Sequence, residues 1–595
     1  MGRSEPLAVV ARGRAAAVLA VLALIAAIAA VYAACGGQLA LTWGAIRISL
    51  RNPFNPTAAA ALAATVAWML DRHSAARAWA RARALVDRSA PAMVGIVVAA
   101  TFSTAVSYGS FVAGGADSSG YLNQARSWRT LAFHEPHPLT GVSWRHRANI
   151  LSPLGFVPAT DFGTIVPFYP PGFPILMAAA ERLGGDGARF LVVPFAGAAT
   201  VLLVFVIARR FGGGLAGIVA ATLTATSPIF TFQLLQPMSD VPATCLWTLT
   251  FALLMSASKW PTVCAGVVAG CAGLVRPNLF VLGLAALPIA AWWRPRFQSP
   301  WTRPLLFASG LLPVVVAFVL WGRFLYGTAG RTGYGSFGTL LAVDRVWANL
   351  TRYADWLIAI EPMAFLAPVA LLVLPRTGDD SRFTWRAATA ILFFFAVLLG
   401  FYLLYTVFDD WTYLRFLLPG VPLLIALSAS AFVALVDRLG RAPGLVVTLL
   451  VVTALGTLDV QASVRRGTFA IADGERRFEL AGHWLLAHTP RTAAMVSALH
   501  SGSARYYASR MPLRWDWIEP ADMPGVLRDL HSRGQGAWLV LDAGERDQFA
   551  ARHPRVLAAL DEHQPVAEFG APTSVWIYDL SPLQLAAMRT GDSYQ

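Results

Sequence analysis

Apolar runs of about 15 to 22 residues recur through most of the chain, and short segments rich in arginine separate them. A helix needs about 20 apolar residues to cross the hydrocarbon core of a bilayer, so runs of this length predict membrane-spanning helices. The composition agrees, because 56% of the 595 residues are hydrophobic and only 13% are charged. We therefore expect an all-α polytopic membrane domain.

The arginine clusters indicate the topology. Lys and Arg outnumber Asp and Glu enough to give a net charge of +14, and cytoplasmic loops of membrane proteins are enriched in basic residues. If every cluster faces the cytoplasm, the spans alternate consistently, with the N-terminus cytoplasmic and the tail periplasmic in a bacterial inner membrane. We interpret the positive charge in this way and expect no nucleic-acid partner.

This alternation predicts about thirteen transmembrane helices. The run at residues 172–183 is too short to cross the membrane, so we expect it to lie at the outer interface. The shortest span, 261–275, has the alternative of being half of a re-entrant pair. The expected spans are residues 15–34, 56–71, 92–113, 188–208, 211–231, 240–258, 261–275, 278–293, 304–322, 358–375, 387–407, 416–436 and 443–460.

Three regions follow from this pattern. Residues 1–91 hold the first spans and a basic cytoplasmic loop, residues 92–460 form the main transmembrane domain with an outer loop at 114–187, and residues 461–595 form a periplasmic α/β domain. In the last region, 492–497, 537–541 and 574–578 have strand patterns, and 524–533 and 545–552 have helix patterns. The four cysteines lie in or beside apolar runs, which predicts packing roles and no disulfide framework.

An acidic residue, Asp117, stands at the start of the outer loop, just beyond a predicted span. Tyr121 follows four residues later and would share a helix face with it. A carboxylate at the membrane edge is a candidate for catalysis at the interface. The alternative is that Asp117 caps a short helix after the Gly114-Gly115 pair.

Four motifs in a fixed order resemble membrane glycosyltransferases of the GT-C class, in particular bacterial relatives of protein mannosyltransferases and of the aminoarabinose transferase of lipid A. The resemblance covers roughly residues 92–440, and the tail is similar to the outer domain of many such enzymes. The motifs are Ala-Asp-Ser-Ser-Gly-Tyr at 116–121, Phe-Tyr-Pro-Pro-Gly-Phe-Pro at 168–174, Gln-Pro-Met-Ser-Asp-Val-Pro at 236–242 and Tyr-Leu-Arg-Phe-Leu-Leu-Pro at 413–419.

The resemblance implies that Asp117 is the catalytic acidic residue of the first outer loop, with Tyr121 and Tyr169 beside the substrate. Asp240 is the candidate second carboxylate, and its alternative is a helix N-cap. Many relatives have a second acid directly after the first, where this chain has Ser118. That difference weakens the case for paired carboxylates that bind a metal, although a divalent metal stays possible.

Two arginines are candidates for binding a lipid phosphate. Arg276 lies deep in apolar sequence, where a charged residue is costly and marks a functional site by default. Arg415 stands at the outer entrance of a span, against the cytoplasmic preference of Arg, and snorkelling to lipid headgroups is its alternative explanation. Either guanidinium can hold a phosphate by charge-assisted hydrogen bonds.

Two further clusters of side chains are candidates for other roles. His134, Glu135, His137 and His146 have loose spacing for metal ligands, and Pro136 opposes a helix that would display them together. Trp515-Asp516-Trp517 in the tail would suit stacking on a sugar, with the packed edge of a core as the alternative.

We expect from these residues an enzyme that moves a hexose or pentose from a polyprenyl-phosphate carrier to a glycan, lipid or protein acceptor. Asp117 would act as general base on the acceptor hydroxyl, and Arg276 or Arg415 would stabilise the leaving phosphate. The rival interpretation is a transporter or flippase whose pathway Arg276 would line. A third is a non-catalytic assembly protein that binds partners through its tail.

Overall fold

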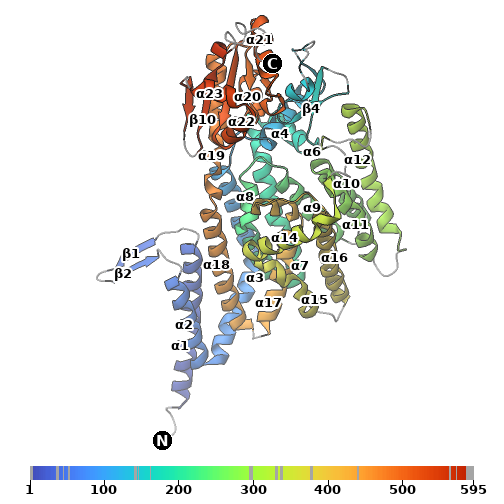
Figure 1. Cartoon of the computed structure of the whole chain (residues 1–595). Coiled ribbons are helices and arrows are strands. Elements are labelled where there is room, and N and C mark those ends of the chain that lie inside the picture. Colours follow the sequence, from blue (N-terminus) through green and yellow to red (C-terminus); the bar gives the residue numbers. More distant parts are fainter. Residues whose placement is uncertain are drawn as a thin grey trace.

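The computed structural model describes residues 5–583, with gaps at 35–38, 44–45, 51–53, 138, 140–141, 143, 145, 161–162, 257, 294–298, 329–332, 335–339, 375–378, 439–440, 562–563 and 571–572. Most of the described chain is helical. Long helices form a bundle, and a five-stranded sheet with its own helices covers one end of it (Figure 1). We call this the sheet end; the N-terminus lies at the opposite end.

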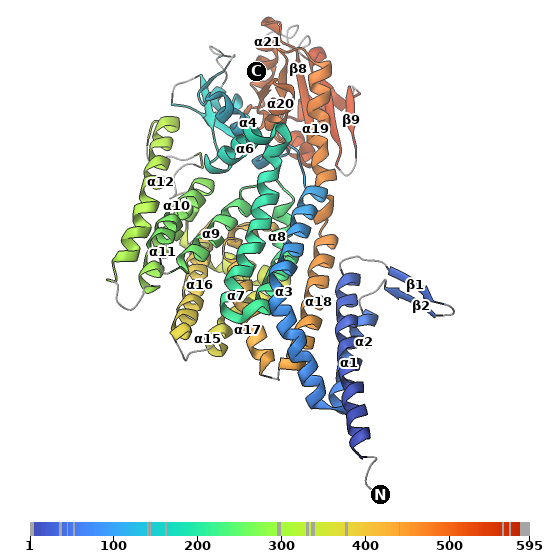
Figure 2. The same cartoon turned by 180° about the vertical axis from the view of Figure 1, so that it is seen from behind.

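The first helices form a separate layer at the edge of the bundle. Helices α1 (Glu5–Ala34) and α2 (Phe54–Leu70) are connected through the antiparallel strands β1 (Leu39–Trp43) and β2 (Ile46–Leu50), and they lie beside α3 (Arg72–Tyr108) and α18 (Arg441–Arg465) (Figure 2). The basic segment expected as a cytoplasmic loop is instead the first part of α3. The Asp71 carboxylate caps this helix, accepting the N–H groups of His73 and Ser74 at 3.0 and 3.2 Å, and the Ala and Arg residues that follow favour helix.

Helix α7 (Val192–Thr226) is two antiparallel pieces. Its backbone is non-helical at Gly212 and Gly213, and Gly213 has a φ of 79°. A Cβ at Gly217 would lie 3.0 Å from the carbonyl oxygen of Phe205, whereas twelve residues of straight helix would separate these positions by about 18 Å. The chain therefore turns back at the glycines, as the two expected spans at 188–208 and 211–231 require.

Two other expected spans are broken. The segment predicted as one helix at 358–375 belongs to α14 (Val346–Ile360) and the helical pieces η4 (Pro362–Val369) and α15 (Ala370–Val373), which meet α14 at 97°. Similarly, η5 (Trp411–Leu417) meets α17 (Val421–Asp437) at 82°. Among the described residues, five helices are long and apolar enough to cross a membrane, or seven if each bent pair is one span. The expected count of thirteen is not confirmed, because several apolar helices are short or bent.

The remaining helices of the bundle follow the expected apolar runs closely. Helix α6 is the short segment that we expected at the interface. The bounds are α6 (Gly172–Gly184), η1 (Asp186–Leu191), α8 (Pro228–Leu234), α9 (Asp240–Leu254), α10 (Lys259–Val275), η2 (Pro277–Leu279), α11 (Phe280–Trp292), α12 (Thr302–Tyr326), η3 (Val343–Arg345) and α16 (Asp379–Leu403).

The outer loop expected at 114–187 carries its own small fold at the sheet end. It contains α4 (Asp117–Thr130), α5 (Arg147–Ile150) and α6. The antiparallel strands β3 (Glu135–Pro136), β5 (Thr164–Pro167) and β4 (Phe156–Pro158) form a sheet in that order. Figure 1 shows α4 and α6 near the junction of the bundle and the sheet end, and β4 beside the five-stranded sheet.

The C-terminal residues form a mixed sheet in the order β7-β6-β8-β10-β9. Strand β6 is parallel to β7 and β8, and β10 is antiparallel to β8 and β9. The expected strands at 492–497, 537–541 and 574–578 and the helices at 524–533 and 545–552 are confirmed. The elements are η6 (Thr468–Ala470), α19 (Ile471–His488), β6 (Ala494–Val496), α20 (Ser501–Ala508), β7 (Met511–Leu513), η7 (Trp515–Trp517), α21 (Met523–Ser532), β8 (Ala537–Asp542), η8 (Ala543–Glu545), α22 (Arg546–Arg552), α23 (Pro554–Asp561), β9 (Ala567–Phe569) and β10 (Val575–Asp579).

The outer loop and the C-terminal region share a hydrophobic core. Leu139, Ile150 and Leu151 of the loop belong to the same buried cluster as Leu539 and Leu541 of β8. Burial of apolar surface on both sides of such a contact stabilises it. The loop is therefore held by the C-terminal sheet as well as by the bundle.

Candidate active site

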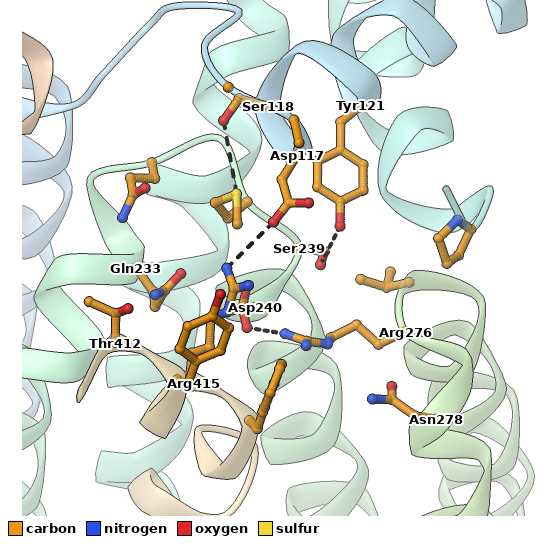
Figure 3. Close-up of a pocket in the computed structure, with 18 of the residues that line it drawn as sticks. Asp117, Ser118, Tyr121, Gln233, Ser239, Asp240, Arg276, Asn278, Thr412 and Arg415 are labelled. Atoms are coloured by element: carbon orange, nitrogen blue, oxygen red, sulfur yellow. Dashed lines mark hydrogen bonds and ion pairs between the residues drawn. The ribbon is translucent and has the colours of Figure 1, made fainter. Parts of the chain in front are cut away.

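A cavity of about 640 Å³ lies where the bundle meets the sheet end. Its walls come from the start of α4, the α8–α9 connection, the break between α10 and η2, η5, and α19 (Figure 3). Asp117, Tyr121, Asp240, Arg276 and Arg415 all line it. The sequence motifs that carry these side chains are thus brought together from distant parts of the chain.

Asp117 is the first residue of α4, and its carboxylate does not cap the helix. The N-cap position is Ala116, which has no side-chain cap. The Asp117 carboxylate accepts a hydrogen bond of 2.6 Å from the Tyr169 hydroxyl and lies 3.5 Å from the Arg415 guanidinium. Its side chain is 34% exposed. The capping alternative is therefore wrong, and the carboxylate faces the cavity.

Tyr121 and Tyr169 form an aromatic wall beside Asp117. Their ring centroids are 4.5 Å apart, and the Tyr121 hydroxyl forms a 2.9 Å hydrogen bond with that of Ser239. Burial and the neighbouring Asp117 raise the pKa of both phenols. Both tyrosines consequently stay neutral, and the Tyr169 hydroxyl can donate a hydrogen bond to the Asp117 carboxylate.

Glycines allow these elements to approach closely. A Cβ at Gly120 would collide with the Tyr169 ring, and a Cβ at Gly172 would lie 2.6 Å from the backbone of Leu274. The second contact packs the start of α6 against the end of α10, directly before Arg276. The Tyr-Pro-Pro-Gly motif thus connects the Asp117 region to the Arg276 region.

Asp240 and Arg276 form a buried ion pair in the wall of the cavity. Asp240 begins α9, its side chain is 2% exposed, and it accepts a hydrogen bond from the Arg276 guanidinium. Arg276 has an extended backbone between α10 and η2, and its guanidinium lies over the Phe416 ring at 5.3 Å. Because its carboxylate is engaged by Arg276, Asp240 does not fit a metal shared with Asp117.

Arg415 points into the cavity from η5, where its guanidinium lies close to the Asp117 carboxylate. Its guanidinium lies 5.2 Å from the centroid of the Tyr413 ring and 5.6 Å from that of Phe416. The side chain is 19% exposed, and its Nε is buried without a hydrogen-bond acceptor among the described residues. An anion in the cavity would supply that acceptor.

Some lining residues were not foreseen from the sequence. Glu475 reaches the cavity from α19, and a Cβ at Gly114 would collide with its carboxylate. Gln233 from α8 and Thr412 from η5 add polar atoms on the same side (Figure 3). The Gly114-Gly115 pair was the available signal, since a glycine there leaves room for a neighbouring group.

The His cluster does not form a metal site in the described residues. His137 accepts the N–H of Leu139 at 3.1 Å, His134 packs on the Phe324 ring, and His146 lies beside Trp517. Burial lowers the pKa of His137 to about 4. No group of three or more Asp, Glu, His or Cys side chains that could hold a metal ion occurs in the described parts of the chain.

The Trp-Asp-Trp motif divides between the core and the surface. Trp515 is buried against Phe549, with ring centroids 5.2 Å apart, whereas Trp517 is 41% exposed. Asp516 pairs with Arg514. Trp515 is therefore a packing residue, as the alternative interpretation expected.

Comparison with known proteins supports the resemblance. The family described as dolichyl-phosphate-mannose-protein mannosyltransferase matches residues 169–321, about a quarter of the chain. No curated protein matches the chain in sequence. Among solved structures, ArnT from Cupriavidus metallidurans bound to undecaprenyl phosphate is similar with a TM-score of 0.52 and 12% identity, over 81% of this chain and 97% of ArnT.

The apo state of the same ArnT gives a TM-score of 0.51 at 12% identity, over 82% of this chain and 98% of ArnT. An oligosaccharyltransferase of Archaeoglobus fulgidus is less similar, with a TM-score of 0.45 and 13% identity over 80% of this chain and 73% of that one. The expected resemblance to GT-C glycosyltransferases is confirmed.

Proposed function

We propose that this protein transfers one sugar from a polyprenyl-phosphate carrier to an acceptor hydroxyl at the outer face of a bacterial inner membrane. The observation that carries the proposal is the cavity itself. It combines an accessible carboxylate, Asp117, with the guanidinium groups of Arg276 and Arg415. A base for the acceptor and cations for a leaving phosphate are the groups that such a transfer needs.

Asp117 is the better candidate for the base, and Asp240 for a positioning residue. The Asp117 side chain is 34% exposed, whereas Asp240 is 2% exposed and is held by Arg276. In the proposed step, Asp117 takes the proton of the acceptor hydroxyl as that oxygen bonds to the anomeric carbon. The bond from the anomeric carbon to the phosphate oxygen breaks, its electrons stay on the phosphate, and the configuration inverts.

Arg415 is the better candidate for direct contact with the donor phosphate. Its buried Nε has no acceptor among the described residues. Its guanidinium lies 3.5 Å from Asp117, so a phosphate bound to Arg415 would be close to the base. Arg276 adds a second positive charge, which Asp240 holds in place. The phosphate leaves as a stable anion and needs no general acid.

The sheet end would face the periplasm. It carries the outer loop and the C-terminal α/β region that were expected there, and it lies opposite the N-terminus (Figure 1). A donor lipid would keep its chain in the bilayer and place its phosphate in the cavity between the bundle and the sheet end. A divalent metal has no step in this proposal.

Two substitutions test the proposal together. Asp117→Asn keeps a hydrogen-bond acceptor but loses the base, and loss of general-base catalysis typically costs a factor of about 10² to 10⁴ in rate. Arg415→Leu should weaken binding of undecaprenyl phosphate, which Asp117→Asn should leave intact. The measurements are binding of undecaprenyl phosphate to purified protein and recovery of the missing glycan in a deletion strain.

The expected pattern separates an enzyme from a flippase, since a flippase does not need a general base. Asp186→Asn is a suitable control, because Asp186 lies outside the cavity and is 85% exposed. Near-normal glycan in the Asp117→Asn strain would overturn the assignment of the base. Unchanged binding of undecaprenyl phosphate in Arg415→Leu would remove Arg415 from the donor site.

A further inference from the structure

A second cavity, of about 390 Å³, lies between the C-terminal half of α4 and the end of α20. We call it the arginine pocket, because Arg126, Arg505 and Arg510 line it together with one carboxylate, Glu135. The hydroxyl groups of three Ser and Thr residues and the amide of Asn123 complete a polar lining. The proposed reaction uses none of these residues.

The described residues neutralise only part of the positive charge of the pocket. Arg505 pairs with Glu135, which leaves Arg126 and Arg510 without a carboxylate partner in the described part of the chain. Arg510 is 5% exposed, and all the acceptors of its guanidinium in the described residues are neutral. They are the carbonyl oxygens of Ala508 and Thr489, each at 2.6 Å, the carbonyl oxygen of Leu486 at 3.1 Å and the hydroxyl of Thr489 at 2.9 Å. A buried charge without a counterion is unfavourable, so an anion entering the pocket would be attracted.

The arginines at the mouth are held in place before any ligand arrives. The Arg126 guanidinium lies over the Tyr506 ring at 4.8 Å and donates to the Tyr506 carbonyl oxygen at 3.0 Å. The Arg505 guanidinium lies over the Phe156 ring at 4.5 Å. Fixed guanidinium groups lose less side-chain entropy when they bind an oxyanion.

We propose that the arginine pocket binds a phosphate group carried by the acceptor of the transfer or by a lipid headgroup. Arginine and hydroxyl donors suit phosphate oxygens, and the volume has room for a sugar unit beside the phosphate. Helix α4 connects this pocket to the active site, since Arg126 follows Asp117 by nine residues, or about 14 Å of helix. The assignment to an acceptor rests on the proposed function, whereas the binding of phosphate does not.

Glucose 6-phosphate is the probe, and glucose is its uncharged counterpart. Their binding is measured by calorimetry on the purified full-length protein in an uncharged detergent. Arg126→Gln should weaken glucose 6-phosphate binding about tenfold, because one charge-assisted hydrogen bond is lost. Arg129→Gln is the matched control, since Arg129 lies on the same helix but contacts Glu181 outside the pocket.

Asp117→Asn should bind glucose 6-phosphate with the affinity of the wild type. The binding test is therefore valid even if Asp117 is not the base of a transfer reaction. Equal affinity for glucose, or equal weakening in Arg126→Gln and Arg129→Gln, would overturn the proposal. Binding lost in Arg415→Leu but kept in Arg126→Gln would do the same, because the phosphate would then lie in the main cavity.

Phosphatidylglycerol added to the micelles separates the two sources of the phosphate. If it displaces glucose 6-phosphate in the wild type, the pocket holds a lipid headgroup. If glucose 6-phosphate stays bound, the phosphate belongs to the acceptor.

Discussion

At the scale of single residues, burial separates two carboxylates that the sequence presents in similar settings. Asp117 and Asp240 each begin a helix beside the cavity. The Asp117 carboxylate is accessible and contacts Tyr169 and Arg415. The Asp240 carboxylate is buried in an ion pair with Arg276. A base must reach its substrate, so only the first suits proton transfer, and the second suits holding a cation in place.

Asp240→Asn should therefore reduce stability more than Asp117→Asn does. Removing one partner of a buried ion pair typically costs about 3 to 5 kcal/mol, because the other charge stays buried and unpaired. A half-exposed pair contributes roughly 0 to 1 kcal/mol. Thermal unfolding of both variants in the same detergent measures the difference, and the double variant Asp240→Asn/Arg276→Gln should regain part of the loss. Equal unfolding temperatures for the two single variants would contradict the assignment.

Glu475 is the residue that sequence reasoning missed, and it gives a second prediction. Its carboxylate lines the cavity directly beside Gly114, where it can accept a hydrogen bond from a sugar hydroxyl. Glu475→Gln should lower the transfer rate about tenfold, the typical effect of losing one hydrogen bond to a charged group. Asp473→Asn, two residues earlier on an exposed face of α19, should leave the rate unchanged.

The same residue predicts a pH dependence. Burial raises the pKa of Glu475, so its carboxylate is protonated at a higher pH than an ordinary Glu. The wild type should lose activity on acidification at a pH above the usual range for Glu, and Glu475→Gln should lack that step. The relative transfer rates of the two proteins between pH 5 and 8 measure it, and parallel profiles would exclude Glu475 as the cause.

At the scale of elements, the sequence predicted where most apolar helices lie but not where they bend. The turn in α7 was anticipated by the boundary between the expected spans 188–208 and 211–231. The break after α14 was missed, although Pro362 follows Glu361 and a residue before proline disfavours helix. At the bend, Glu361 accepts a hydrogen bond from Ser227, 134 residues earlier in the chain, and a single sequence does not reveal such a pairing.

In the candidate active site, too, the sequence predicted the residues but not their partners. All six residues singled out from the motifs lie at the cavity or, for Tyr169, in contact with Asp117. The pairing of Asp240 with Arg276 and the approach of Glu475 depend on how separate helices pack. Local patterns identify polar residues at helix ends, whereas their partners follow only from the tertiary fold.

Helix α19 depends on a buried polar network for its position. The Asp542 carboxylate at the end of β8 accepts the Nε–H of Arg477 at 2.7 Å and lies 3.3 Å from His500. Burial raises the pKa of Asp542, but hydrogen bonds from His500 and Arg477 outweigh this effect and hold the pKa well below its usual range. The stabilisation is therefore present above the ordinary Asp pKa and is lost only in strong acid.

Asp542 does not line the cavity, but it holds α19, which carries Glu475. Asp542→Asn should therefore make the position of α19 less fixed and move Glu475 out of the cavity. We expect a loss of about 3 kcal/mol or more in the stability of the sheet end, since Arg477 would lose its buried counterion. Faster proteolysis at the sheet end and a lower transfer rate should appear together. Asp529→Asn, at a partly exposed residue that pairs with Arg533, should change neither. A stable but inactive Asp542→Asn protein would contradict this explanation.

At the scale of the whole molecule, the function requires that the sheet end and the bundle act as one unit. The cavity takes residues from both, and the outer loop shares a core with the C-terminal sheet. A donor held in the bilayer can then meet an acceptor outside it. This proposed arrangement predicts an orientation of the protein in the membrane, which reporter fusions can measure.

Helix α18 determines that orientation for the C-terminal region. Residues 444–465 form an apolar segment of 22 residues, long enough to cross the membrane, and Arg438 precedes it. In the proposed orientation, the positive-inside preference would place Arg438 in the cytoplasm and therefore α19 in the periplasm. Alkaline phosphatase fused after Gly474 should be active and green fluorescent protein fused there dark, with the opposite result for fusions after Arg438. If both positions report the same side, α18 does not span the membrane, and the active site cannot lie at the periplasmic face as proposed.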